Sequence, residues 1–154
     1  MCIRDSQEIE ALKIAAGLKG QSPWGVKLGV GSFLTMEFGD PREKQLSSFV
    51  HGDWGLWLYM CNWRIEIGSE IVTGSNDDRS VIEAALKELL LGPLETVTLL
   101  DPALDLSLQF SSRTKLLTFS SSSNRDEEQW KLFTPDGHCL TICGDGSAEY
   151  PLAS

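Results

Sequence analysis

Apolar and polar residues alternate regularly in the second half of the chain. In residues 104–110 every second residue is Leu or Phe, and Asp, Ser and Gln stand between them. A period of two predicts a strand with one buried and one solvated face, as in an antiparallel sheet. Similar short segments follow one another between turn-forming residues, which indicates a β meander. Its five predicted strands are Leu94–Leu100, Leu104–Phe110, Lys115–Ser120, Gln129–Phe133 and Cys139–Cys143.

The segment from Trp54 to Ile67 has apolar residues on both alternating faces over most of its length. This pattern predicts one long central strand that is covered on both sides. Shorter strands are predicted at Val26–Gly29, at Phe33–Phe38 with Leu34, Met36 and Phe38 facing inward, and at Glu70–Thr73. Residues 40–52 contain Pro41 and mixed charges, and they predict a long, mobile hairpin loop.

One helix is well marked, over residues 77–91. Ser75 and Asp78 have the spacing of an N-terminal capping box, and Gly92-Pro93 forms a typical end. The side chains expected to form its buried stripe are Val81, Ile82, Ala85, Leu86, Leu89 and Leu90. A second, short helix is predicted over Glu8–Leu18, where apolar residues recur near helical spacing before Gly17 and Gly20.

These elements predict the α+β class: an antiparallel sheet meander with one main helix packed on it and a short N-terminal helix. Residues 7–154 form a single predicted domain, which agrees with the length of 154 residues. The first six residues, Met-Cys-Ile-Arg-Asp-Ser, resemble a translated sequencing adapter. We therefore expect residues 1–6 to be an artefact that is disordered or packed against nothing.

Cysteine usage bears on the compartment. No export signal or long apolar run is evident, and Cys61, Cys139 and Cys143 remain once residues 1–6 are set aside. An odd number of cysteines without export favours free thiols in a reducing compartment, so a cytoplasmic location is predicted.

The charge is unevenly distributed. The net charge is −9, and residues 70–105 carry −6 of it. An acidic surface is repelled by nucleic-acid backbones and anionic membranes, so neither is predicted as a partner. A basic protein partner is compatible with this charge, although the acidity can also serve solubility alone.

Chemical motifs are weak. Gly29-Val30-Gly31-Ser32 lies between predicted strands, where a turn is expected rather than a dinucleotide loop. Cys139 and Cys143 would lie roughly 13 Å apart on a strand, which disfavours both a shared zinc ion and a disulfide. Cys61 with His51 could form a thiol and base pair, but a thiol in a tryptophan-rich strand is better explained by core packing. No catalytic residue, cofactor or metal is predicted.

Several stretches resemble an uncharacterised bacterial family of small domains that look like toxin-immunity proteins. They are residues 24–39, 54–64, 104–110 and 130–137, within Trp24–Tyr150. The resemblance implies a binding role and supplies no catalytic residue. It suggests an immunity protein that occludes the basic active-site cleft of a toxin.

The acidic side chains predicted to bind that partner are Glu70, Asp77, Asp78, Glu83, Glu88, Asp126, Glu127 and Glu128. Tryptophans are a second candidate: Trp54 and Trp57 must face opposite sides of a strand, and a half-exposed indole is a natural hot spot. The alternative function is a small-ligand binder or enzyme with a cleft near Arg64, Glu66 and Glu37. An accessory subunit whose apolar patch is covered in an oligomer is a third possibility, and the sequence does not predict the oligomeric state.

Overall fold

The chain forms two antiparallel sheets that face each other across one core. The computed structural model describes residues 3–42 and 51–152, and of residues 3–7 and 42 it describes the backbone only. The helices and strands follow one another along the chain as α1 (Ile3–Ala15), η1 (Ala16–Leu18), β1 (Trp24–Leu28), β2 (Leu34–Arg42), β3 (His51–Leu58), β4 (Asn62–Ile67), β5 (Glu70–Gly74), α2 (Arg79–Lys87), β6 (Leu94–Leu100), β7 (Asp105–Phe110), β8 (Thr114–Phe119), β9 (Glu128–Phe133), β10 (Cys139–Cys143) and β11 (Ala148–Glu149).

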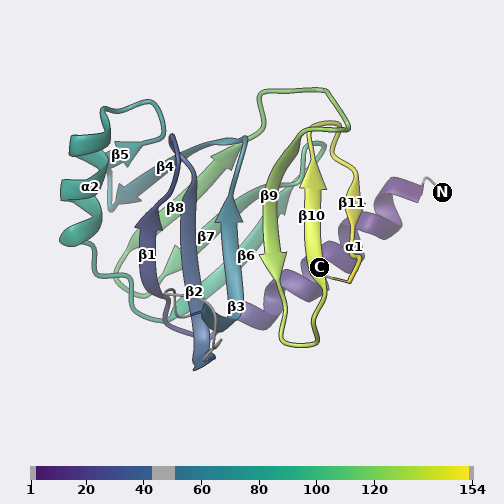
Figure 1. The fold of residues 1–154 in the computed structure, drawn as a ribbon, viewed down its shortest axis with the longest axis horizontal. Helices are drawn as coiled ribbons and strands as arrows, with labels where there is room; N and C mark the ends of the chain where they lie inside the picture. The colour runs from purple at the N-terminus through teal and green to yellow at the C-terminus, as the bar shows by residue number, and fades with distance from the viewer. Residues whose placement is uncertain (1–2, 43–50, 153–154) are drawn as a thin grey trace.

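A six-stranded sheet has the order β1-β2-β3-β9-β10-β11, and a five-stranded sheet has the order β5-β4-β8-β7-β6. Figure 1 shows the six-stranded sheet in front and the other sheet behind it, with the strands of the two layers crossing obliquely. The predicted α+β class with antiparallel strands is confirmed. The arrangement differs from a single meander with a helix on it, because each sheet covers the inner face of the other.

The long central strand predicted over Trp54–Ile67 is wrong. The segment divides into β3 and β4, which belong to different sheets, and the chain crosses between the layers at residues 59–61. Leu56 and Leu58 point into the core from β3, whereas Trp63 and Ile65 do so from β4. The inward positions thus change from even to odd numbers at the crossing. Two half-buried strands placed end to end have the same sequence pattern as one strand buried on both faces.

The strands after α2 match their predictions. β6 to β10 lie within one residue of the predicted bounds at each end. Leu104, Leu106, Leu108 and Phe110 are fully buried, as their alternation predicts. The predicted inward face of the second strand is confirmed as well, since Leu34, Met36 and Phe38 are buried. β11 was not predicted.

Two buried tryptophans link the sheets. Nε1 of Trp63, in the five-stranded sheet, donates to the Ser32 carbonyl of the β1–β2 turn at 2.7 Å. Nε1 of Trp130, in the six-stranded sheet, donates to the Leu104 carbonyl before β7 at 3.0 Å. Each indole N–H therefore has a hydrogen-bond acceptor across the layers, so burial of the indole ring leaves no unpaired donor. Leu104 has a φ of 57°, a costly value for a leucine, and this bond and its burial help to hold it.

The main helix is shorter than predicted and does not pack on a sheet. α2 covers nine residues and buries Ile82, whereas Val81 and Leu90 from the predicted stripe are 48% and 81% exposed. It contacts edge strands β5 and β1, at the left of Figure 1. The physical reason is that the two sheets already cover each other's apolar faces. α2 therefore covers only the open side of the sandwich, between the edge strands β5 and β1.

Of the two predicted capping residues, Ser75 and Asp78, Ser75 stabilises the five-stranded sheet instead. The Ser75 hydroxyl accepts a hydrogen bond from the Trp63 backbone N–H at 3.0 Å. The Asp77 carboxylate accepts from the Gly74 N–H and from the Thr73 hydroxyl. Asp78 is the N-cap residue, and its side chain makes no capping bond.

The N-terminal helix is confirmed, and it begins earlier than predicted. α1 and η1 together contact β6 and β11 on the side of the sandwich opposite α2 (Figure 1). The helix starts at Ile3, so residues 3–6 of the adapter-like segment are helical rather than disordered. Their side chains lie outside the described residues, which leaves the packing part of that prediction untested.

The two ends of the predicted hairpin loop, residues 40–42 and 51–52, belong to strands. β2 continues to Arg42 and β3 begins at His51. Residues 43–50 lie outside the described part of the chain. Within that part, neither helix has the length and apolar character needed to cross a bilayer.

We predict that a core leucine and a leucine of the predicted helical stripe beyond the end of α2 contribute very differently to the free energy of unfolding. Leu108→Ala should lower the free energy of unfolding by about 2–5 kcal/mol, because it leaves a cavity in the sealed core. Leu90→Ala should change it by less than about 0.5 kcal/mol, because the side chain is exposed. Urea unfolding measures both variants. Equal losses of unfolding free energy in the two variants would show that Leu90 packs as the helical periodicity predicts.

Candidate functional site

A groove lies on the outer face of the six-stranded sheet. It encloses about 580 Å³ and is lined by β2, β3, β9, β10, β11 and the segment that follows β11. We call it the outer groove. The core side chains of the same strands point the other way, so groove and core are the two faces of one sheet.

The strand register builds the groove from two rows of side chains. One row runs Glu37, Gly55, Phe133 and Cys139 across four strands. The next row runs Thr35, Trp57, Lys131, Thr141 and Glu149 across five. Gly55 has no side chain, so the Glu37 carboxylate and the Phe133 ring of the neighbouring strands cover its backbone.

Glu37 is the most buried charged group of the groove, with an exposed fraction of 7%. It fits because glycines flank it on both neighbouring strands: a Cβ at Gly25 would lie 3.3 Å from its Cγ, and one at Gly55 would lie 3.3 Å from its Oε2. Gly25 has a φ of +60°, at a bulge in the β1–β2 pairing. The carboxylate is fixed by His51 Nδ1 at 2.9 Å from Oε1 and by the Gly52 N–H at 3.4 Å from Oε2.

Aromatic rings form the opposite wall. The rings of Trp57 and Phe133 meet edge to face, with centroids 4.8 Å apart. Lys131 Nζ lies 6.0 Å from the Phe133 centroid and 3.1 Å from Glu128 Oε2. Phe133 therefore already accepts one cation near its ring, and that cation is paired with a carboxylate.

The outer groove is acidic. Its lining includes four carboxylates, Glu37, Asp53, Glu128 and Glu149, and a single lysine, Lys131. With His51 neutral, these described side chains give the groove a net charge of −3. Glycine and aromatic surface lies between the charges, so the groove suits a ligand that is both cationic and partly apolar.

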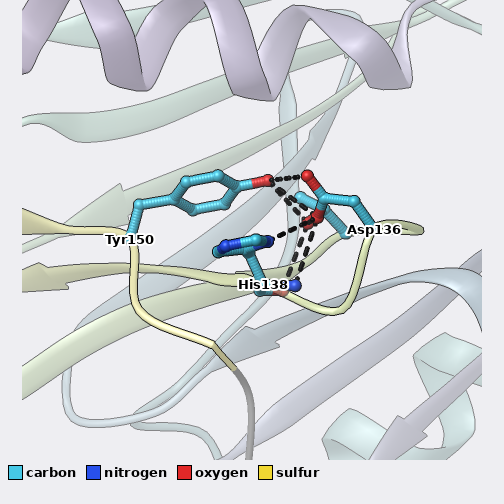
Figure 2. Close-up of polar contacts among 4 residues, drawn as sticks. Asp136, His138 and Tyr150 are labelled. Atoms are coloured by element: carbon cyan, nitrogen blue, oxygen red, sulfur yellow. Dashed lines mark hydrogen bonds and ion pairs between the residues drawn. The ribbon is translucent and has the colours of Figure 1, made fainter.

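A cluster of hydrogen bonds joins the β9–β10 hairpin to the segment after β11, and its side chains do not line the groove. Figure 2 shows Tyr150, from the segment after β11, beside Asp136 and His138 of the β9–β10 hairpin. The Tyr150 hydroxyl lies 3.1 Å from Asp136 Oδ1, and its ring stacks on the imidazole with centroids 4.8 Å apart. The Asp136 carboxylate also accepts from the Thr134 hydroxyl and the His138 backbone N–H. These bonds lower the Asp136 pKa to about 2, the Thr134 bond most of all.

This cluster has the residue types of a catalytic triad but not its proton path. A nucleophilic hydroxyl must give its proton to histidine. Here the hydroxyls of Thr134 and Tyr150 both meet the Asp136 carboxylate. His138 Nδ1 is 3.2 Å from that carboxylate without alignment for a hydrogen bond. The arrangement fastens the C-terminal segment to the hairpin, together with the Cys139 N–H bond to the Pro151 carbonyl.

The thiol and base pair considered for Cys61 and His51 does not form, and the core packing predicted for Cys61 is confirmed. Cys61 is buried in the core at the sheet crossing, and burial raises its pKa to about 12. His51 meets Glu37 in the outer groove instead. Cys139 and Cys143, at the two ends of β10, are also buried thiols whose pKa burial raises. In the part of the chain that the structure describes, no group of His, Cys, Asp and Glu is arranged to hold a metal ion.

The structure divides the predicted partner-binding residues into two groups. Glu70, Asp77, Asp78, Glu83 and Glu88 lie on or beside β5 and α2, whereas Asp126, Glu127 and Glu128 lie in the β8–β9 loop and the start of β9. Figure 1 places α2 and that loop on different sides of the sandwich. In the first group Glu83 pairs with Arg79 at 2.9 Å. In the second, Glu128 lines the outer groove.

The cleft predicted around Arg64, Glu66 and Glu37 is not formed. Arg64 and Glu66 pair with each other at 2.7 Å on the outer face of the five-stranded sheet. Glu37 belongs to the outer face of the six-stranded sheet. The core separates the two faces, so only Glu37 lines the groove.

Sequence reasoning missed most of the groove because its residues come from five strands far apart in the chain. One signal was present. Gly52 and Gly55 lie within a strand, where glycine often marks a close approach of another group. Trp57, weighed as one of two tryptophans facing opposite sides, is half-buried in the groove. Trp54 packs on the other face, where its ring lies against Gly17 of η1.

We predict that the Asp136 carboxyl titrates with a pKa of about 2. Because folding lowers this pKa, the cluster contributes stability above pH 3.8 that is lost as the pH falls toward 2. Tyr150→Phe should raise the Asp136 pKa, since one hydroxyl partner is removed. Carbon-detected NMR titration measures it. Asp145 is the internal control, because its lowered pKa depends on Ser147, and its titration should not move.

We also predict that Cys61 resists alkylation in the folded protein. A pKa of about 12 in place of 9.0 lowers the thiolate fraction at pH 8 about a thousandfold. Peptide mapping after iodoacetamide treatment, with and without urea, measures the labelling rate. Labelling of Cys61 at equal rates in both conditions would contradict its burial.

Comparison of the chain with models of protein families, with curated proteins and with solved structures found no match. The resemblance to immunity-type domains therefore stays a prediction.

Proposed function

We propose that this chain is a binding domain for a basic protein partner and that the outer groove is its docking surface. The observation that carries the proposal is the combination of a net charge of −3 with the Trp57–Phe133 wall in one concave surface. Interfaces of this kind gain association rate from charge and affinity from buried aromatic side chains.

The charge of the whole molecule supports the same partner. A net charge of −9 attracts a basic protein from a distance, and a concave surface concentrates that field. Glu128 lines the groove and Asp126 and Glu127 precede it directly, so the late acidic loop can contribute to steering. Glu70, Asp77, Asp78, Glu83 and Glu88, on the far side, contribute to the general field rather than to this contact.

The specific form that we favour is an immunity-type inhibitor, in which the groove receives a basic projection of a toxin and the surrounding surface occludes the toxin's active site. It follows from the resemblance and the acidity together. The groove supplies a physical means, because a rigid acidic surface can cover a basic catalytic cleft without chemistry of its own.

A second candidate is a small-ligand binder or enzyme that uses Glu37. The observation that favours it is the Glu37–His51 contact of 2.9 Å, in which a buried carboxylate orients an imidazole that is 37% exposed on its side chain. An oriented imidazole can act as a general base. Binding of small cations with no preference for peptides would favour this candidate.

A panned peptide library tests the main proposal. Random twelve-residue peptides displayed on phage and selected against the protein should converge on sequences rich in Arg and Lys. Glu128→Gln with Glu149→Gln should weaken the selected peptides about three- to tenfold, mostly through slower association, and added salt should slow association of the unaltered protein as well. Replacing Asp126, Glu127 and Glu128 by Lys should slow the association of the peptides further.

The matched control removes two carboxylates outside the groove, Glu66→Gln and Glu83→Gln, each of which pairs with an arginine as Glu128 pairs with a lysine. This variant should bind the peptides nearly unchanged. A selected consensus without basic residues, or equal losses in both double variants, would rule out the groove as the docking surface.

A further inference from the structure

The carboxylates of the outer groove are spread across it rather than gathered at one point. Asp53 lines it from β3, and Glu149 lines it from β11. Trp57 follows Asp53 by four residues on β3, and it shares a row of the sheet with Glu149, three strands away. At about 3.3 Å per residue along a strand and about 4.8 Å between strands, Asp53 and Glu149 are roughly 20 Å apart.

An aromatic ring lies between these two carboxylates. Phe133 pairs with Gly55, which is midway between Asp53 and Trp57 on β3, and it lies one strand nearer to β11. Its ring meets that of Trp57 with centroids 4.8 Å apart. The groove therefore has an apolar centre with a negative charge on each side of it.

Lys131 makes this centre unfavourable for a second cation. Its Nζ lies 6.0 Å from the centroid of the Phe133 ring and 3.1 Å from Glu128 Oε2. A basic side chain laid over Phe133 would compete with Lys131 for the ring and meet a like charge, which opposes binding. An uncharged apolar side chain at the same place meets no such repulsion.

The dimensions of the groove favour an extended segment over a helix. Its floor consists of two rows of side chains, which are about 7 Å apart along the strands. A helix with its side chains is about 10–12 Å across. An extended segment of about six residues spans the roughly 20 Å between Asp53 and Glu149.

We infer that the partner docks through an extended segment with one uncharged apolar residue over Phe133 and a basic residue on each side, one near Asp53 and one near Glu149. This inference rests on the proposed function and specifies the segment that the groove recognises. Lys131 is the specificity-determining residue, because it excludes a basic side chain from the centre.

Two capped peptides of identical composition test the order of residues. The first is Arg-Gly-Ser-Leu-Ser-Gly-Arg, which reads the same in both directions, so its orientation in the groove does not matter. The second exchanges the first arginine with the central leucine. Each is titrated into the full chain and followed by the NMR signal of the Trp57 indole. The first peptide should bind at least fivefold more tightly than the second.

A lysine variant tests the cause of this preference. In Lys131→Met, the ratio of the two affinities should fall at least threefold, because the central arginine no longer meets a like charge. Lys115→Met is the matched control, since it removes the same charge from the outer face of the five-stranded sheet. Its ratio should stay as in the unaltered protein. Thermal unfolding verifies that both variants are folded.

The outcomes separate this inference from the proposed function. Equal binding of the two peptides, or a preference that Lys131→Met leaves intact, overturns the inferred order of residues. If the peptides still bind the groove in that case and lose affinity with added salt, the proposed function stands. If neither peptide binds, the inference is overturned, and the peptides selected from the library alone decide the proposed function.

Discussion

The pairing register of the six-stranded sheet is the constraint on which the rest of the structure depends. With β2, β3, β9 and β10 in this register, rows such as Met36–Leu56–Leu132–Leu140 face the core, and the neighbouring row Glu37–Gly55–Phe133–Cys139 faces outward. A slip of one residue in any strand would exchange the two faces of that strand. The same hydrogen bonds therefore produce both the sealed interior and the outer groove, and the bonds of Trp63 and Trp130 across the layers hold the two sheets against each other.

The hydrophobic pattern of neighbouring residues predicted those strands whose burial follows a simple alternation. The alternation in residues 104–110 was sufficient because one face of β7 is buried and the other is not. The segment from Trp54 to Ile67 was misinterpreted because periodicity reports burial of a position without saying which layer covers it. The stripe on α2 was overestimated for a related reason: the apolar faces that would have received it were already covered by the opposite sheet. Ser75 has the spacing of a helix cap, yet its hydroxyl accepts from Trp63, twelve residues away.

The candidate site was the least predictable part. Glu37 was singled out as a polar group of interest, and its partners were assigned from the wrong sheet because strand order cannot be deduced from alternation. The Glu37 carboxylate lies where a side chain at position 55 would be, and a glycine in a strand predicts such a close approach without saying which group approaches. The acidic residues were identified individually, and only the register shows that Glu128 shares a surface with Trp57 whereas Glu83 does not.

The walls of the groove stand on strands that are hydrogen-bonded to one another, and this has a kinetic consequence. A surface of this kind has its shape before any partner arrives, so binding requires little rearrangement of the sheet. Encounter would then be governed by diffusion and long-range attraction, and the lifetime of the complex by the short-range contacts. Under the proposed function, natural variation along the β3 and β9 rows would alter the lifetime of the complex, with much less effect on its rate of formation.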